Sequence, residues 1–199
     1  AVKFQVFEPE TLARDGLNKT KQQQRYTKNN LPLTKMWKKM YLSFRQLKKL
    51  EKISKKLKID FICSVFDEKS LKKVKKLNLK FIKIASSEIN NHYLLNLIKK
   101  SKKKIILSTG LADEKEISEA LKILGKKIYV LHCVSSYPCS KNLANIKRMD
   151  MIKKKFNVQV GYSDHVIGNY ASFVAINLGA KIIEKHFTLN KNLKGADHI

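Results

Sequence analysis

Residues 81–133 read FIKIASSEINNHYLLNLIKKSKKKIILSTGLADEKEISEALKILGKKIYVLHC, and this stretch decides the fold class. Three short runs rich in β-branched residues (81–85, 105–109 and 128–133) alternate in it with two segments of helical period (93–100 and 114–124). The pattern predicts strand, helix, strand, helix and strand in that order. Strict alternation of this kind indicates a parallel sheet covered by helices.

The alternation continues on both sides of this stretch. Further strands are expected at 1–5, 61–65, 158–163 and 180–187, and further helices at 42–57, 71–77, 146–156 and 170–178. An open doubly wound sheet can hold seven strands, whereas a TIM (β/α)₈ barrel needs eight. The sequence begins inside a strand and without an initiator Met, so we expect a fragment: a barrel that lacks its first strand, with residues 1–199 forming a single domain. The polar segment 7–39 is expected to be a long loop, which is usually functional or mobile.

The composition is strongly basic, with 42 Lys and Arg against 16 Asp and Glu and a net charge of +26. Only four of the basic residues are Arg, the residue that dominates base and phosphate recognition in nucleic-acid binding proteins. The Lys residues alternate with Leu and Ile in helical segments, which is typical of solvated helix faces. We therefore expect no nucleic-acid partner.

Targeting and redox signals are few. The three Cys residues show no CxxC spacing, which favours a reduced, cytoplasmic protein. No apolar stretch reaches the roughly 20 residues that a membrane span needs, so no membrane association is expected.

Polar residues interrupt five of the expected strands, mostly near their carboxyl ends, where parallel barrels carry their active sites. They are Lys3 and Gln5, Lys83, His132, Ser163 and His165, and Glu184 and His186. A lone buried His is usually a satisfied core residue, but a buried charge without a partner costs several kcal/mol. Because five strands show the same interruption, we expect these side chains to converge on one site.

The loops after these strands are short and rich in small hydrogen-bond donors. They are Ser86-Ser87, Ser108-Thr109-Gly110, Ser135-Ser136-Tyr137-Pro138 and Ser163-Asp164-His165. Hydroxyl and backbone N–H groups together with Lys suit a phosphate monoester, although Ser, Thr and Gly are also ordinary turn formers. The nucleotide motifs GxxxxGK[ST] and GxGxxG do not occur.

His165 and His186 lie in adjacent expected strands and are candidates for sharing one divalent metal. Imidazole suits Mn, Fe or Zn better than Mg, and two His ligands leave positions open for water or substrate. Glu184 is expected to orient a ligand or to act as an acid or base.

Eight motifs along the chain carry a resemblance to a known family. They are Lys3-Phe4-Gln5, Lys83-Ile84-Ala85-Ser86-Ser87-Glu88, Leu107-Ser108-Thr109-Gly110, Leu131-His132-Cys133, Ser136-Tyr137-Pro138, Gly161-Tyr162-Ser163-Asp164-His165, Glu184-Lys185-His186-Phe187-Thr188 and Gly195-Ala196-Asp197-His198. In kind and order they resemble the sialic acid synthases, a family that includes N-acetylneuraminate, legionaminate and pseudaminate synthases. The resemblance implies a (β/α)₈ barrel whose first strand carries a further catalytic Glu, a C-terminal antifreeze-like domain that this chain lacks, and a homodimer.

The resemblance also implies roles for individual residues. The residues implied to bind phosphoenolpyruvate are Ser64, Lys83, Ser86, Ser108, Ser135 and Ser163. The implied catalytic residues are Lys3, Glu88, Tyr137, Glu184 and Asp197, and the implied metal ligands are His165 and His186, for Mn²⁺ with Mg²⁺ or Co²⁺ as alternatives. Two departures are Cys63-Ser64-Val65 in place of Ser-Thr-Pro, and Ala196 in place of a Pro, which leaves the loop of Asp197 less rigid.

The implied reaction condenses phosphoenolpyruvate with an N-acetylmannosamine-type aldehyde to give a nonulosonic acid and phosphate. An alternative is another phosphoenolpyruvate-dependent synthase that makes 3-deoxy-sugar acids from phosphorylated aldoses. A remote alternative is a basic nucleic-acid-binding module, which predicts retention that falls steeply with salt.

Overall fold

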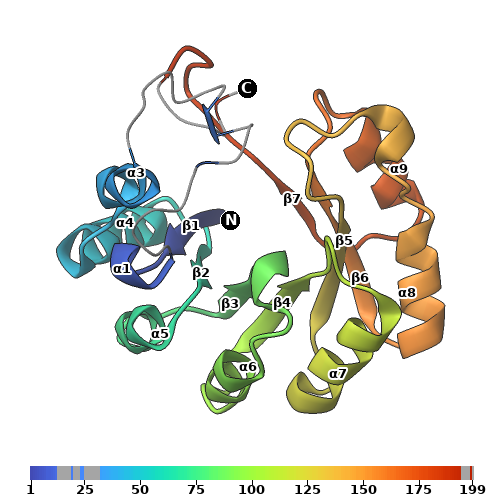
Figure 1. Cartoon of the computed structure of the whole chain (residues 1–199), viewed down its shortest axis with the longest axis horizontal. Helices are drawn as coiled ribbons and strands as arrows, with labels where there is room; N and C mark the ends of the chain where they lie inside the picture. The colour runs from blue at the N-terminus through green and yellow to red at the C-terminus, as the bar shows by residue number, and fades with distance from the viewer. Residues whose placement is uncertain (13–18, 20–22, 25–31, 194–197, 199) are drawn as a thin grey trace.

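The computed structural model describes residues 1–12, 19, 23–24, 32–193 and 198. Seven parallel strands follow one another in the sheet in chain order, which confirms the predicted strand count for this part of the chain. They are β1 (Val2–Val6), β2 (Phe61–Val65), β3 (Phe81–Ile84), β4 (Lys104–Ser108), β5 (Tyr129–Cys133), β6 (Gln159–Asp164) and β7 (Ile183–Lys185). Figure 1 shows the sheet curled into a half-barrel with the helices on its outer, convex side.

The helices connect successive strands. They are α1 (Pro9–Leu12), α3 (Leu33–Met40), α4 (Phe44–Lys56), α5 (Glu68–Lys75), α6 (His92–Lys99), α7 (Glu114–Leu124), α8 (Arg148–Phe156) and α9 (Tyr170–Asn177), with 3₁₀ turns η1 (Ser86–Glu88) and η2 (Lys141–Leu143). Capping boxes begin α4, α5 and α7, since Ser43, Asp67 and Asp113 each accept a hydrogen bond from the third residue of the helix. These local signals explain why the predicted helices form within a few residues of their expected bounds.

Two expectations about elements were wrong. The segment 7–39 was expected to be a loop, but it contains α1 and α3, and α3 is anchored because the Trp37 ring lies 5.2 Å from that of Phe7. The last strand was expected at 180–187 and is only three residues long, because the ladder with β6 covers only Ile183–Lys185.

No helix in the described part of the chain is long and apolar enough to cross a membrane.

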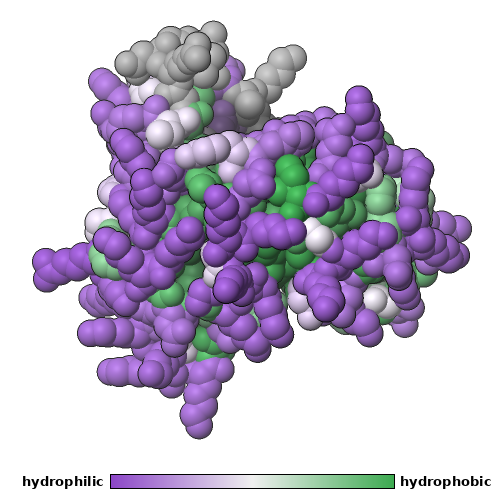
Figure 2. Space-filling view, turned by 90° about the horizontal axis from the view of Figure 1, so that it is seen from below, coloured by the Kyte–Doolittle hydropathy of each residue, from purple (hydrophilic) through white to green (hydrophobic). Residues whose placement is uncertain are grey.

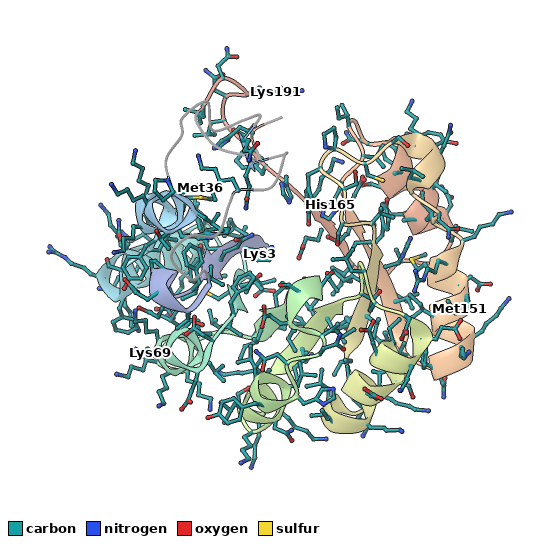
Figure 3. All side chains as sticks on the ribbon, viewed as in Figure 1. Lys3, Met36, Lys69, Met151, His165 and Lys191 are labelled. Carbon is teal, nitrogen blue, oxygen red and sulfur yellow. The ribbon has the colours of Figure 1, made fainter. Side chains whose placement is uncertain are left out.

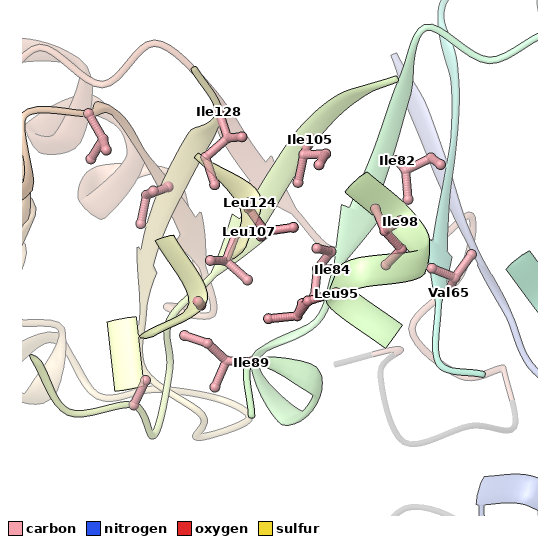
Figure 4. Packing of buried hydrophobic residues seen from close by; sticks show 14 of the residues in the cluster. Val65, Ile82, Ile84, Ile89, Leu95, Ile98, Ile105, Leu107, Leu124 and Ile128 are labelled. Carbon is pink, nitrogen blue, oxygen red and sulfur yellow. The ribbon is translucent and has the colours of Figure 1, made fainter. Parts of the chain in front are cut away.

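The main hydrophobic core lies between the sheet and the helices. Ile84 of β3 and Leu107 of β4 are fully buried there, against Leu95 and Ile98 of α6 and Leu124 of α7 (Figure 4). Burial of a Leu or Ile side chain stabilises the fold by roughly 1.5–3 kcal/mol. Since successive strand residues point to opposite faces, the neighbours of these residues project to the concave side.

The Lys residues lie mainly on the outer surface, as the helical patterning predicted. Hydrophilic side chains project over most of the face in Figure 2, with some hydrophobic surface between them. Lys49, Lys52 and Lys56 of α4, for example, are exposed.

Candidate active site

The concave side of the sheet collects polar side chains from strands far apart in the chain. Lys3 of β1 and His165, directly after β6, both lie on this side, whereas Lys69 and Met151 lie on the outer helices (Figure 3). Parallel registry places Ser64 beside Lys83, and Ser163 beside Glu184. Polar inward-facing residues of neighbouring strands thus lie side by side on this face.

A charged cluster occupies the centre of this surface. Lys83 is 2% exposed, and its Nζ donates hydrogen bonds to Ser108 Oγ at 2.7 Å and to the Ile84 carbonyl at 2.9 Å. Glu184 Oε1 lies 3.9 Å from Lys83 Nζ and 3.5 Å from Lys3 Nζ. The Lys3–Glu184 pair joins the two edge strands of the described sheet, so the sheet curls far enough for side chains to meet across the opening.

The electrostatics of the cluster follow from its burial. Burial lowers the pKa of Lys83 to about 8, with Glu184 opposing the shift and Lys3 adding to it. Burial alone raises the pKa of Glu184, but Lys83, Lys3 and a hydrogen bond from Ser163 outweigh it, and the net shift is downward. The cluster therefore holds two ammonium groups around one carboxylate, an excess of positive charge suited to an anionic ligand.

Small groups from three loops meet beside this cluster. Ser86 Oγ accepts a hydrogen bond from the Gly110 backbone N–H at 2.9 Å and lies 3.2 Å from Cys133 Sγ. A Cβ added to Gly110 would lie 2.6 Å from Ser135 Oγ and 2.7 Å from Cys133 Sγ. Only glycine lets the backbone approach these side chains so closely. Sequence reasoning missed Cys133 and Gly110 as individual site residues, although both stand in motifs beside expected ones.

Three rings form a second cluster at the mouth of the curved sheet. The Tyr137 ring centroid lies 4.1 Å from that of His165 and 5.6 Å from that of His186, and the two imidazole centroids are 5.5 Å apart. His165 Nδ1 lies 2.6 Å from the Val134 carbonyl oxygen, which assigns its proton to Nδ1 and leaves Nε2 as the acceptor. Burial lowers the pKa of His165, so the neutral ring is favoured.

The ring cluster opens into a cavity of about 290 Å³. Tyr137, His165 and His186 line it together with residues 166–169, 187–188 and 191. Ser163 connects the ring cluster to the charged cluster, because its Oγ donates to Glu184 Oε1 at 3.2 Å and lies 3.5 Å from His165 Nε2. The two clusters therefore form one site.

Some of the residues predicted from the sequence fall outside these contacts or outside the described structure. Glu88 lies in η1, where its carboxylate accepts hydrogen bonds from Ser87 and Asn91. Ser64 Oγ is buried on the concave side, and among the described residues no group hydrogen-bonds to it. Asp197 lies outside the described residues. His132 was expected at the site, but it points away from it, and its Nε2 lies 2.9 Å from the carbonyl oxygen of Ala144, directly after η2. Its neighbour Cys133 takes the inward position.

Comparison with known proteins shows the family of the chain. The profile of the NeuB family matches residues 1–199. The chain belongs to the NeuB family. The N,N'-diacetyllegionaminic acid synthase of Campylobacter jejuni is a relative that is 42% identical over 99% of this chain and 61% of its own length.

Other relatives of this NeuB chain give the same picture. The N,N'-diacetyllegionaminic acid synthase of Legionella pneumophila is 37% identical over 100% of this chain and 58% of its own length. The crystal structure of N-acetylneuraminic acid (sialic acid) synthetase from Leptospira borgpetersenii serovar Hardjo-bovis superposes with a TM-score of 0.86 at 33% identity, covering 100% of this chain and 66% of that one. The chain thus spans about three fifths of the length of these two legionaminic acid synthases.

Proposed function

We propose that the complete protein condenses phosphoenolpyruvate with an N-acetylmannosamine-type aldehyde to give a nonulosonic acid and phosphate. The observation that carries this proposal is the buried Lys83, held by Ser108 among the hydroxyl groups of the concave surface and beside Glu184. Members of the family that resemble this chain are named as legionaminic, pseudaminic and N-acetylneuraminate-9-phosphate synthases, which supports it. In the complete protein an eighth strand between β7 and β1 would close a TIM barrel around the site.

The anionic substrate is assigned to the charged cluster and the small-group loops. Lys83 and Lys3 supply positive charge, and Ser64, Ser86, Ser108, Ser135 and Ser163 supply hydroxyl groups for the phosphate and carboxylate oxygens. The buried Ser64 hydroxyl, which lacks a partner in the described structure, suits this role because a buried polar group needs a hydrogen bond. Phosphoenolpyruvate would lie with its reactive C3 toward the ring cluster.

The ring cluster fits a divalent metal, which we propose to be Mn²⁺, with Mg²⁺ or Co²⁺ as alternatives. His165 presents Nε2 because Nδ1 is bound to the Val134 carbonyl, the arrangement typical of a metal-ligating His. His186 would be the second ligand, and no set of three or more potential His, Cys, Asp or Glu ligands occurs among the described residues. A bound ion would supply Lewis-acid polarisation of the sugar aldehyde.

The remaining chemistry falls to the side chains of the site. C3 of phosphoenolpyruvate forms the new bond to the aldehyde carbon, and a water molecule adds to C2, where positive character develops. The C2–O bond to phosphate then breaks, and Lys3 and Lys83 stabilise the departing charge. Glu88, Glu184 and Asp197 are the carboxylates proposed to move protons, and Tyr137 is proposed to pack against the sugar.

We also propose that the complete protein acts as a homodimer in the cytoplasm. All three cysteines, Cys63, Cys133 and Cys139, are free and buried, which is compatible with a reducing compartment.

The proposed reaction predicts which sugars release phosphate. The complete protein with Mn²⁺ and phosphoenolpyruvate is expected to release inorganic phosphate with N-acetylmannosamine or its N-acetylated derivatives and not with arabinose 5-phosphate. A phosphate-release assay over this panel, with product masses determined in parallel, makes the measurement. Turnover with arabinose 5-phosphate alone would favour the 3-deoxy-sugar-acid alternative.

The affinity for phosphoenolpyruvate is expected to fall above pH 8. The pKa of Lys83 in the ligand-free protein is about 8, and the anion binds the ammonium form. Below this pH Lys83 is protonated, whereas at higher pH binding must first recover a proton, so Kd should rise about tenfold between pH 7 and pH 9. Calorimetric titration across this range measures the change, and a flat profile would contradict the role of Lys83.

A further inference from the structure

A buried ion pair lies directly behind the ring cluster. Asp164 immediately precedes His165 in the chain, and Lys185 immediately precedes His186. The two are register partners in the ladder between β6 and β7, and Lys185 Nζ lies 2.9 Å from Asp164 Oδ2. The Asp164 side chain is 0% exposed and that of Lys185 is 29% exposed.

The pair is the centre of a hydrogen-bond network that holds the backbone next to His165. Asp164 Oδ2 also accepts a hydrogen bond from Ser172 Oγ of α9 at 2.6 Å, and Asp164 Oδ1 accepts one from the Val166 backbone N–H at 2.9 Å. Lys185 Nζ donates a second bond to the Val166 carbonyl at 2.6 Å. One network therefore ties together β6, β7, α9 and the residue that follows His165.

The network helps to place β7, which is short and lies at the edge of the described sheet. β7 has three residues, and in the described structure its ladder is with β6 alone. A buried carboxylate that loses its cation must be relieved by water or by movement of the chain. His165 directly follows β6, and His186 directly follows β7. Movement of β7 relative to β6 would therefore carry His186 away from His165.

We propose that Asp164 and Lys185 form a positioning pair that fixes the separation of His165 and His186 and so builds the proposed metal site. The inference deepens the function proposed above and rests on it. Asp164 and Lys185 reach the wall of the cavity, but their hydrogen bonds satisfy each other and the surrounding chain. They act through the two histidines and not through the substrate.

The test compares Lys185→Met, Lys185→Arg and Asp164→Asn in the complete protein. Lys154→Met is the matched control, because Lys154 forms an exposed ion pair with Asp150 on α8 at 2.7 Å. Mn²⁺ alone and phosphoenolpyruvate alone are titrated by calorimetry, kcat and KM are determined for each substrate, and circular dichroism checks the fold. The imidazole resonances of His165 and His186 are recorded by NMR without ligand.

Lys185→Met and Asp164→Asn are expected to weaken Mn²⁺ binding about tenfold or more, with kcat falling in proportion. Phosphoenolpyruvate affinity should stay close to that of the wild type, because Lys83 lies in the other cluster. Lys185→Arg should retain most of the wild-type Mn²⁺ affinity. Lys154→Met should leave Mn²⁺ affinity, phosphoenolpyruvate affinity and kcat at their wild-type values. Should Asp164→Asn not fold, the two Lys185 variants decide the question.

Four results would overturn the proposal. Mn²⁺ affinity equal to wild type in Lys185→Met would show that the pair does not position the histidines. Equal losses of Mn²⁺ and phosphoenolpyruvate binding would show general loosening, and a raised KM for the sugar alone would place Lys185 on the substrate. If the wild type binds neither Mn²⁺ nor phosphoenolpyruvate, the proposed function fails. The imidazole resonances then still test whether the pair positions the histidines. Shifts that occur in Lys185→Met and not in Lys185→Arg would support this role, and unchanged resonances in Lys185→Met would reject it.

Discussion

Replacement of Lys83 by Met is expected to weaken phosphoenolpyruvate binding by about a hundredfold while leaving sugar binding nearly intact. Each hydrogen bond from a charged donor contributes about 1.5–3 kcal/mol, and the buried ammonium lies where solvent screens it little. Met keeps most of the side-chain volume, so the change removes charge without opening a large cavity. Titration calorimetry with each substrate in turn gives the two dissociation constants.

Lys104→Met is the matched control for this prediction. Lys104 also belongs to a strand of the sheet, but it is exposed at the start of β4, the opposite end from the site. It should bind phosphoenolpyruvate as the wild type does. Comparable losses of phosphoenolpyruvate and sugar affinity in Lys83→Met would mean that the substitution disturbs the whole site, and the assignment of Lys83 to the anion would be wrong.

The strands were predictable because their signal is local. A short β-branched run between two amphipathic segments has few alternative structures, and 61–65 and 114–124 have the predicted bounds. The polar interruptions were equally visible, and Lys83, Ser163 and Glu184 do meet on the concave side. A charged side chain inside an apolar strand needs a partner, because an unpaired buried charge is costly. Few other charged residues occur in the strands, so the candidates for that partner were few.

The features that were missed depend on contacts between distant residues. Period-two alternation separates His132 from Cys133, but it does not say which of the two faces inward, since that choice is set by the register with β6. The helix α3 is stabilised by the contact between Trp37 and Phe7, thirty positions apart in the sequence. The Asp164–Lys185 pair was not predicted for the same reason: the two residues are distant in the sequence, and neither motif shows that its charged residue pairs with the other.

Replacement of His165 or His186 by Ala is expected to lower metal-dependent turnover by about three orders of magnitude. Lewis-acid polarisation of a carbonyl is worth several kcal/mol, and one remaining imidazole would not hold the ion at working concentrations. Phosphoenolpyruvate binding should stay measurable in both variants, because Lys83 and Ser108 are unchanged. The complete protein is first treated with a chelator, and initial rates are then measured over a series of Mn²⁺ concentrations.

His92→Ala serves as the control for this prediction, because His92 lies on α6 and its Nε2 is 3.8 Å from Glu119 at the surface. Its turnover and its Mn²⁺ dependence should match those of the wild type. Full activity of His165→Ala or His186→Ala after chelation and restoration of Mn²⁺ would remove that residue from the metal site. Loss of phosphoenolpyruvate binding together with turnover would instead show that the ring cluster holds the anion, because the charged cluster is intact in these variants.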